Sequence, residues 1–194
     1  MNKTYKIIKR LLDVILSFIG LVILTPFAPF VFVAIKLDSP GRVFFKQRRI
    51  GKDKTVFWLY KFRTMRSDTP KDVPTHLMTG GNHITKLGAF MRRSSIDELP
   101  QLWNILRGDM SVVGPRPALW NQDDLIAERD KYSANDLRPG LTGLAQVMGR
   151  DELPITEKAR YDGEYVKDIS FTKDIKIILK TVGNVLTSKG IVDG

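Results

Sequence analysis

The sequence predicts a mixed α/β, helix-rich fold: one cytoplasmic domain with an N-terminal re-entrant membrane segment and amphipathic helices at the membrane surface. Three observations support this. A nearly unbroken apolar run fills residues 11–37, aromatic-rich segments typical of strands follow at 42–63, and helical apolar spacing recurs in the later half. The 194 residues suffice for one domain with a real core, so we divide the chain into a membrane segment, 1–37, and a membrane-associated domain, 38–194.

The composition restricts the classes of partner and of chemistry. The formal net charge is +10, which favours phosphate-rich partners such as nucleic acid, anionic lipid or a nucleotide substrate. The sequence contains no cysteine, which excludes disulfide bonds, thiolate metal sites and a cysteine nucleophile. Its two histidines are too few for a histidine-rich zinc site.

The N-terminal segment has the pattern of a broken membrane helix. Its apolar run over 11–37 exceeds the roughly 20 residues that span a bilayer core. Thr25 and Pro26 interrupt the run, because proline kinks a helix and the threonine hydroxyl can bond back to a helical carbonyl. Both flanks are basic, and the positive-inside rule then places both ends in the cytoplasm. This favours a re-entrant helix–break–helix over a kinked transmembrane helix.

A β-hairpin is predicted directly after the membrane segment. Residues 42–48 and 56–63 are β-prone, and the turn signals of 51–54 separate them. Alternation along the second strand places Lys61 and Arg63 on one face. A charged strand face of this kind is commonly just solvated.

Helical patterns follow the hairpin. A short helix over 84–93 is expected to pack Leu87 and Phe90 inward, and an acidic amphipathic helix is expected over 117–131. The glycine-rich segment 137–150 matches no phosphate-loop or dinucleotide fingerprint, and such segments are more often turns than nucleotide cradles.

The last third of the chain predicts two more helices. Residues 155–167 form a helix that contains Asp162. Between Phe171 and Leu186 the apolar residues trace one helical face, with lysines away from it. This pattern suits a helix in a membrane interface, and docking on the protein's own core is an equal alternative.

Two adjacent carboxylates, Asp97 and Glu98, stand just ahead of an apolar helical pattern over 99–106. They therefore lie near a helix start, where backbone N–H groups attract phosphate. The simpler interpretation is a capping box, in which Ser95 and Glu98 only cap the helix. Pro100 weakens this interpretation, because a helix that begins at Pro100 leaves both carboxylates in the preceding turn.

Arg116 stands between Pro115 and Pro117, which restrict the backbone around it. The segment is either a stiff turn with an exposed arginine or a rigid mount for a phosphate ligand.

Together, several motifs resemble the bacterial sugar transferase family, in particular its small monotopic phosphoglycosyl transferases. The ordered set covers nearly the whole chain and is far more specific than any one block, so it overrides the capping interpretation. The blocks are Lys61–Met65, Arg92 with Asp97–Leu102, Gly108–Pro117 and Arg138–Gly143, extended by Gln146-Val147 and Gly149-Arg150.

The resemblance implies a membrane enzyme that moves a sugar-1-phosphate from a UDP-sugar to polyprenyl (undecaprenyl) phosphate and releases UMP, the first membrane step of glycoconjugate synthesis. It implies that Asp97 is the nucleophile, that Glu98 assists it, and that both hold the cofactor Mg²⁺. The implied location is the cytoplasmic face of the bacterial inner membrane, with Thr25-Pro26 as the membrane break. The implied substrate or phosphate ligands are Lys61, Arg63, Arg92, Arg116, Arg138, Gln146, Arg150 and Asp162.

The chemistry fits these residues. A carboxylate nucleophile and a substrate phosphate repel each other, and Mg²⁺ with forked arginine contacts neutralises that repulsion. The alternative reading is a non-catalytic basic protein that binds anionic membrane lipids. A nucleic-acid-binding module is disfavoured, because no such motif is present and the apolar N-terminus has no role in one. A homo-oligomer is left open, and the sequence does not name the sugar.

Overall fold

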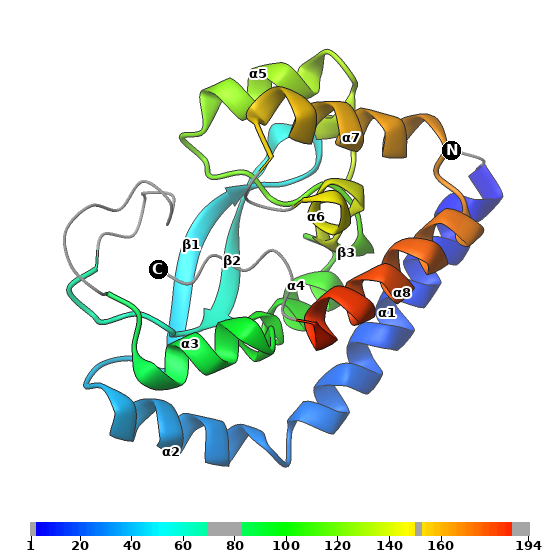
Figure 1. Cartoon of the computed structure of the whole chain (residues 1–194). Coiled ribbons are helices and arrows are strands. Elements are labelled where there is room, and N and C mark those ends of the chain that lie inside the picture. Colours follow the sequence, from blue (N-terminus) through cyan, green and yellow to red (C-terminus); the bar gives the residue numbers. More distant parts are fainter. Residues whose placement is uncertain (1–2, 70–82, 150–152, 188–194) are drawn as a thin grey trace.

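An antiparallel hairpin, β1 (Phe44–Ile50) and β2 (Val56–Phe62), lies at the middle of the fold with helices around it (Figure 1). The structure is a computed structural model and describes residues 3–69, 83–149 and 153–187. The other elements are α1 (Lys3–Leu24), α2 (Ala28–Asp38), η1 (Lys52–Lys54), α3 (Lys86–Arg93), η3 (Ile96–Glu98), α4 (Gln101–Arg107), β3 (Ser111–Val113), α5 (Asp123–Asp130), η4 (Ala134–Asp136), β4 (Gly140–Thr142), α6 (Leu144–Met148), α7 (Ile155–Lys167) and α8 (Phe171–Leu186). The mixed α/β, helix-rich prediction is confirmed.

The N-terminal helices α1 and α2 meet at a sharp bend, visible in Figure 1 as an open V. Thr25 Oγ1 donates to the Leu21 carbonyl at 2.8 Å, the back-bond expected next to Pro26. Within the described residues no helix alone is long and apolar enough to cross a bilayer, whereas α1 and α2 together have the required length and composition but are bent by 66°. The predicted helix–break–helix is therefore present.

Polar contacts hold the first half of α1 on the domain. Arg10 donates to the carbonyls of Ile105 and Leu106 at 2.7 and 2.9 Å, at the end of α4. Asp13 accepts hydrogen bonds from the Val112 amide at 2.8 Å and from the Ser111 hydroxyl at 3.1 Å. These bonds attach α1 to α4 and β3, so the helix is part of the domain's own packing.

Small apolar clusters fill the spaces between the elements. One joins β2 to α4, a second joins β3 to α7 and α8, and a third joins α2 to β2 and α3. Their buried members include Leu59, Ile105 and Met110, then Val113, Tyr165 and Ile177, and then Ile35, Phe62 and Met91.

The glycine-rich segment is more regular than a set of turns. Residues 140–142 form β4, which pairs in parallel with β3, and residues 144–148 form α6. A Cβ on Gly140 would lie 2.1 Å from the Gly114 amide nitrogen. Glycine at this position therefore permits the close approach of the two chain segments.

The prediction that Phe90 packs inward is wrong, because this side chain is 54% exposed. Leu87 does pack against the cluster around Phe62. The buried positions of α3 are Gly88 and Met91. A Cβ on Gly88 would lie 2.0 Å from the Thr64 carbonyl oxygen, so the close approach of α3 to Thr64 selects a different face from the one that spacing indicates.

The apolar face expected over 99–106 is also partly wrong. Trp103 is 49% exposed, and the buried face of α4 contains Gln101, Asn104 and Ile105. The physical reason is the Asn104 amide, which accepts from the Tyr60 amide at 3.1 Å and donates to the Trp58 carbonyl at 2.8 Å. This polar contact with β2 turns Asn104 inward and leaves Trp103 outside.

The acidic helix begins later than expected, at Asp123 rather than at residue 117. The preceding segment pairs instead with β1, where the Ile50 amide donates to the Ala118 carbonyl at 3.0 Å and Arg49 bridges Leu119. Contact with the hairpin therefore replaces the first turns of the predicted helix.

Helix α8 leaves most of its apolar stripe exposed. Asp174 and Ile177 face the protein, while the exposed apolar residues of this helix are Phe171, Ile175, Leu179, Val182 and Leu186. Figure 1 shows α8 alongside α1, and Lys9 of α1 contacts Asp174 at 2.6 Å. The buried face of α8 thus docks on the protein's own core through Ile177, and the exposed stripe is the side that an interfacial helix would turn to lipid.

Candidate active site

The dyad Asp97–Glu98 lies in the short turn η3, immediately before α4. Ser95 adopts a left-handed conformation, with φ +56°, and its side chain makes no capping hydrogen bond. Pro100 is the residue that precedes α4. The helix therefore begins after the dyad, and the capping box does not form.

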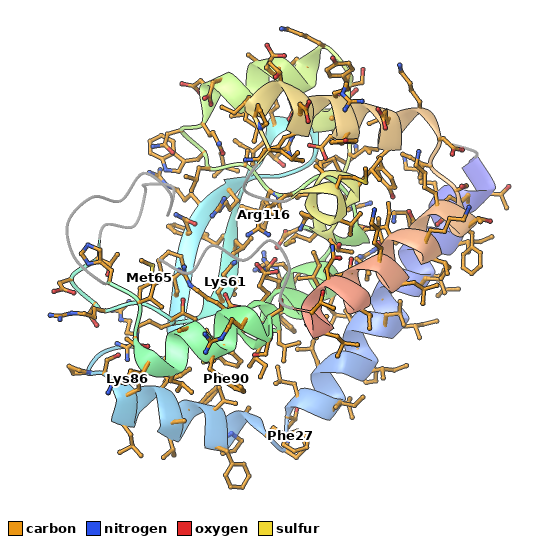
Figure 2. All side chains as sticks on the ribbon, viewed as in Figure 1. Phe27, Lys61, Met65, Lys86, Phe90 and Arg116 are labelled. Atoms are coloured by element: carbon orange, nitrogen blue, oxygen red, sulfur yellow. The ribbon has the colours of Figure 1, made fainter. Side chains whose placement is uncertain are left out.

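Both carboxylates are buried and contact cations from distant segments. The residues Asp97 and Glu98 are 6% and 8% exposed. Lys61 Nζ, from β2, lies 2.7 Å from Glu98 Oε1 and 3.9 Å from Asp97 Oδ2. Arg116 Nη2 lies 3.4 Å from Glu98 Oε1, and Figure 2 labels Lys61 and Arg116 at the same central region of the molecule. The fold thus brings two of the predicted phosphate ligands to the dyad.

The electrostatics of the dyad differ from those of a surface carboxylate. Burial raises the pKa of Asp97, the charge of Lys61 lowers it, and the neighbouring Glu98 carboxylate raises it again. The net direction is upward. The negative charge of Asp97 is therefore incompletely compensated by the neighbouring cations, and a perturbed buried carboxylate of this kind marks a candidate functional site.

Arg92 is held close to this region by α3. Its Nε atom donates to Thr64 Oγ1 at 3.0 Å, and its charge lowers the pKa of Asp97. The close approach of Gly88 to Thr64 positions this arginine. Arg92 is therefore the third predicted ligand with an electrostatic effect on the dyad.

Arg63 lies elsewhere. Its guanidinium is buried and donates to the carbonyls that end α2, at 3.3 Å for Ile35, 2.5 Å for Ser39 and 2.6 Å for Pro40. Although Lys61 and Arg63 are two residues apart on β2, the structure brings only Lys61 to the dyad. Arg63 instead binds the carbonyl end of a helix, which is favourable for a cation.

Arg138 and Gln146 also bind backbone groups. Arg138 Nε donates to the Gly108 carbonyl at 2.8 Å, next to the end of α4. Gln146 Nε2 donates to the Leu141 carbonyl at 3.0 Å, and its Oε1 atom is buried with no partner among the described residues. Arg150, a further predicted ligand, lies outside the described residues.

Asp162 is fully buried in α7 and contacts Arg129 of α5, not the dyad. Its Oδ2 atom accepts from Arg129 Nε at 2.8 Å and lies 2.6 Å from Nη2. Arg129 Nη1 in turn donates to the Arg116 carbonyl at 2.8 Å. Asp162 is therefore connected to the site through another arginine.

Sequence reasoning missed Arg129, Gly88 and Asn104. Each is a polar or small residue within a helix, and only the structure reveals that its position faces inward. The sequence does not identify their partners, because Arg116, Thr64 and the strand β2 are distant along the chain.

The two carboxylates of the dyad suit Mg²⁺, which the protein would bind together with the substrate phosphates. In the part of the chain that the structure describes, no cluster of three or more His, Cys, Asp or Glu side chains could hold a metal by itself. Mg²⁺ is commonly bound by one or two carboxylates, with water and substrate phosphates as its other ligands. The adjacent carboxylates of Asp97 and Glu98 meet that requirement.

Known proteins resemble this chain over nearly its whole length. A model of the bacterial sugar transferase family matches residues 4–188. The UDP-glucose:undecaprenyl-phosphate glucose-1-phosphate transferase of Caulobacter vibrioides is 43% identical over 93% of this chain and 70% of its own length. Exopolysaccharide production protein PSS of Rhizobium leguminosarum bv. phaseoli is 42% identical over 93% of this chain and 96% of its own length. The UDP-N-acetylgalactosamine-undecaprenyl-phosphate N-acetylgalactosaminephosphotransferase of Aeromonas hydrophila is 35% identical over 96% of this chain and 45% of its own length.

All the motif blocks taken from the sequence lie within the matched region. Two of these relatives are named for the transfer of a sugar phosphate to undecaprenyl phosphate. The chain is therefore a sugar-phosphate transferase, and it belongs to the bacterial sugar transferase family.

Proposed function

We propose that this enzyme transfers a sugar-1-phosphate from a UDP-sugar to polyprenyl phosphate through a covalent intermediate on Asp97. The observation that carries the proposal is the buried dyad, in which one carboxylate is paired with Lys61 and Arg116 while the other keeps a raised pKa. Glu98 is the carboxylate with the close cation contacts. Asp97 is the less compensated one and is assigned as the nucleophile.

In the first step a carboxylate oxygen of Asp97 attacks the phosphorus that is attached to the sugar. The bond between this phosphorus and the oxygen that bridges to the other phosphate breaks, and UMP leaves with the electron pair. Asp97 attacks as the ionised carboxylate, which needs no general base. Burial raises the pKa of Asp97, and the charges of Lys61, Arg92 and Arg116 oppose this by favouring the ionised form. The product on the enzyme is an aspartyl phosphosugar.

In the second step a phosphate oxygen of polyprenyl phosphate attacks the same phosphorus. The bond from Asp97 to phosphorus breaks, which regenerates the carboxylate and releases a polyprenyl-diphosphate sugar. Phosphoryl transfer depends chiefly on alignment and on charge stabilisation. Lys61, Arg92 and Arg116 supply positive charge for both steps.

The cofactor assigned to the site is Mg²⁺, held by Asp97 and Glu98. When bound, it neutralises phosphate charge and orients the phosphate oxygens. Lys61 and Arg116 keep Glu98 in place on the protein side. Their contact with Glu98 Oε1 restricts the direction in which this carboxylate faces the substrate.

The acceptor lipid accounts for the membrane elements. The broken pair α1–α2 is assigned as a re-entrant hairpin that enters one leaflet, with both ends and the domain on the cytoplasmic face of the inner membrane. Exposed apolar residues near the bend, such as Phe27 at 59% exposed, support contact with lipid (Figure 2). Phe90 on α3 and Trp103 on α4 are also exposed, at 54% and 49%, on the two helices that flank the dyad in the chain.

The proposed donor is a UDP-sugar whose sugar is not specified. The relatives act on different donors by their names, UDP-glucose and UDP-N-acetylgalactosamine among them. A panel of UDP-hexoses and UDP-N-acetylated sugars, with UMP release as the readout, identifies the donor.

Mass spectrometry of the quenched enzyme tests the mechanism. The purified protein is incubated with Mg²⁺ and labelled UDP-sugar without acceptor, and a phosphosugar adduct on Asp97 is expected. Two-substrate kinetics should be ping-pong, and Asp97→Asn should form no adduct. An obligatory ternary complex with no trapped adduct would refute the covalent step, and absence of UMP release with every donor would favour the non-catalytic lipid-binding alternative.

A further inference from the structure

The segment that carries Arg116 is held by its backbone carbonyl groups. Because Pro115 and Pro117 have no N–H group, the usual backbone donors are missing on both sides of Arg116. Four consecutive carbonyls each accept a hydrogen bond: Pro115 from the Gly140 amide at 2.8 Å, Arg116 from Arg129 at 2.8 Å, Pro117 from Arg49 at 3.0 Å, and Ala118 from the Ile50 amide at 3.0 Å.

Arg129, the donor to the Arg116 carbonyl, is itself held by Asp162. Arg129 is 4% exposed and Asp162 is 1% exposed. Two nitrogens of the Arg129 guanidinium, Nε and Nη2, contact one oxygen of Asp162, at 2.8 and 2.6 Å. The remaining terminal nitrogen, Nη1, points at the Arg116 carbonyl. A planar guanidinium held at one edge has little freedom left at the other.

The contact acts on the peptide plane between Arg116 and Pro117. Proline fixes its own φ, and a following proline excludes much of the α region for the residue before it. Pro117 therefore narrows the ψ torsion of Arg116, and the hydrogen bond from Arg129 holds the Arg116 carbonyl in one orientation within that range. A carbonyl held in this way anchors the backbone that carries the Arg116 side chain, and the Arg116 guanidinium lies only 3.4 Å from Glu98.

We propose that Arg129 and Asp162 are positioning residues, which hold the Arg116 backbone so that its guanidinium faces the dyad. The proposal rests on the proposed function, because it gives Arg116 a role in the transfer reaction. It assigns Asp162 an indirect role through Arg129 instead of the direct substrate contact that the resemblance implies. Stability alone does not account for the pair, since a buried ion pair is often no more stable than apolar side chains of similar volume.

Arg129→Lys is the main variant. Lysine keeps the positive charge beside Asp162, but a single ammonium group cannot contact the Asp162 oxygen and the Arg116 carbonyl in the geometry of the fork. Asp162→Asn is the second variant, which keeps the shape and removes the charge that fixes Arg129. Arg160→Lys is the matched control, because Arg160 lies on α7 with Asp162 and its contacts, an ion pair with Glu164 and the face of the Tyr161 ring, are at the surface.

The expected result is a loss of kcat for UMP release of about 10- to 100-fold in Arg129→Lys and a smaller loss in Asp162→Asn, because a shift of about 1 Å at a catalytic group costs up to about 100-fold. Arg160→Lys should match the wild type. The decisive measurement combines Arg129→Lys with Arg116→Lys. If Arg129 acts through Arg116, the second change should add less than about 2-fold, since residues of one unit are not additive. Fully multiplicative losses would overturn the proposal.

Hydrogen exchange separates this proposal from the proposed function. The amides of Gly140 and Ile50, which donate to the Pro115 and Ala118 carbonyls, should exchange faster in Arg129→Lys than in the wild type, while the amides of α1 and α4 should not change. This readout needs no turnover, so a wild type that transfers no sugar phosphate would refute the proposed function and leave the positioning role to be decided by exchange. Unchanged exchange of the Gly140 and Ile50 amides in both Arg129→Lys and Asp162→Asn would overturn the positioning role.

Discussion

Replacing Lys61 with methionine tests whether the dyad depends on a cation supplied by β2. Lys61 Nζ lies 2.7 Å from Glu98 Oε1, and the side chains of Lys61 and Glu98 are 18% and 10% exposed. Removing one partner of a buried ion pair costs about 3–5 kcal/mol, because the other charge is left buried. Arg116 remains 3.4 Å from Glu98, and Lys61 is partly hydrated. We therefore expect a loss of about 2–3 kcal/mol, below the fully buried range.

Thermal unfolding of the purified protein in a lipid nanodisc measures this loss. For a domain of this size, about 2–3 kcal/mol corresponds to a melting temperature lower by roughly 5–10 °C. Lys46→Met is the matched control, because Lys46 lies on β1 over the Tyr60 ring at 5.3 Å and contacts solvent. Its cost should stay below about 1 kcal/mol.

The double variant Lys61→Met with Glu98→Gln measures the coupling free energy between these two side chains. It removes both charges, so much of the lost stability should return, although turnover should remain at least about 100-fold below the wild type. A Lys61→Met protein as stable as Lys46→Met, or a double variant with fully additive losses, would show that the Lys61–Glu98 contact contributes no net stability.

Arg116→Lys keeps the charge but not the fork, so turnover should fall about 100-fold with an unchanged melting temperature; near-normal turnover would contradict a phosphate contact. Asp97→Asn should be inactive yet more stable than the wild type at pH 7.5 in EDTA. Burial raises the folded-state pKa of Asp97, so the native state binds the proton more tightly than the unfolded state, and wild-type stability falls as pH rises from about 4 through the raised pKa. The gain in Asp97→Asn should therefore shrink toward pH 4 in a melting series, and a gain that is the same at all pH values would refute this cause. Single cysteines at Asn2 and Ser39 should both resist an impermeant thiol reagent on intact cells and react after permeabilisation, because both ends are assigned to the cytoplasm. Labelling of only one of them from outside would mean that the segment spans the membrane. Pro26→Ala is expected to promote such a spanning arrangement.

Features that depend on local backbone chemistry could be predicted from the sequence. Pro26 cannot continue a helical hydrogen-bond ladder, so the break between α1 and α2 follows from the residue itself. Pro100 likewise places the start of α4 after the dyad. The β-hairpin follows from two β-prone runs around a short turn, and the ordered motifs identify the family. The helix break, the helix start and the hairpin each follow from residues that are neighbours in the sequence.

The tertiary structure alone decided which cation meets which acceptor. Lys61 and Arg63 are near neighbours in the sequence, yet Lys61 contacts the dyad while Arg63 binds the carbonyl end of α2. Both are long, flexible cations, and the fold determines whether a carboxylate or a helix terminus lies within reach of each. Asp162 was likewise predicted at the substrate, and packing of α7 on α5 instead gives it Arg129 as a partner. A sequence motif therefore names the charged residues of such a site, whereas the contacts made after folding decide whether each one contacts the reacting groups or holds the residues that do.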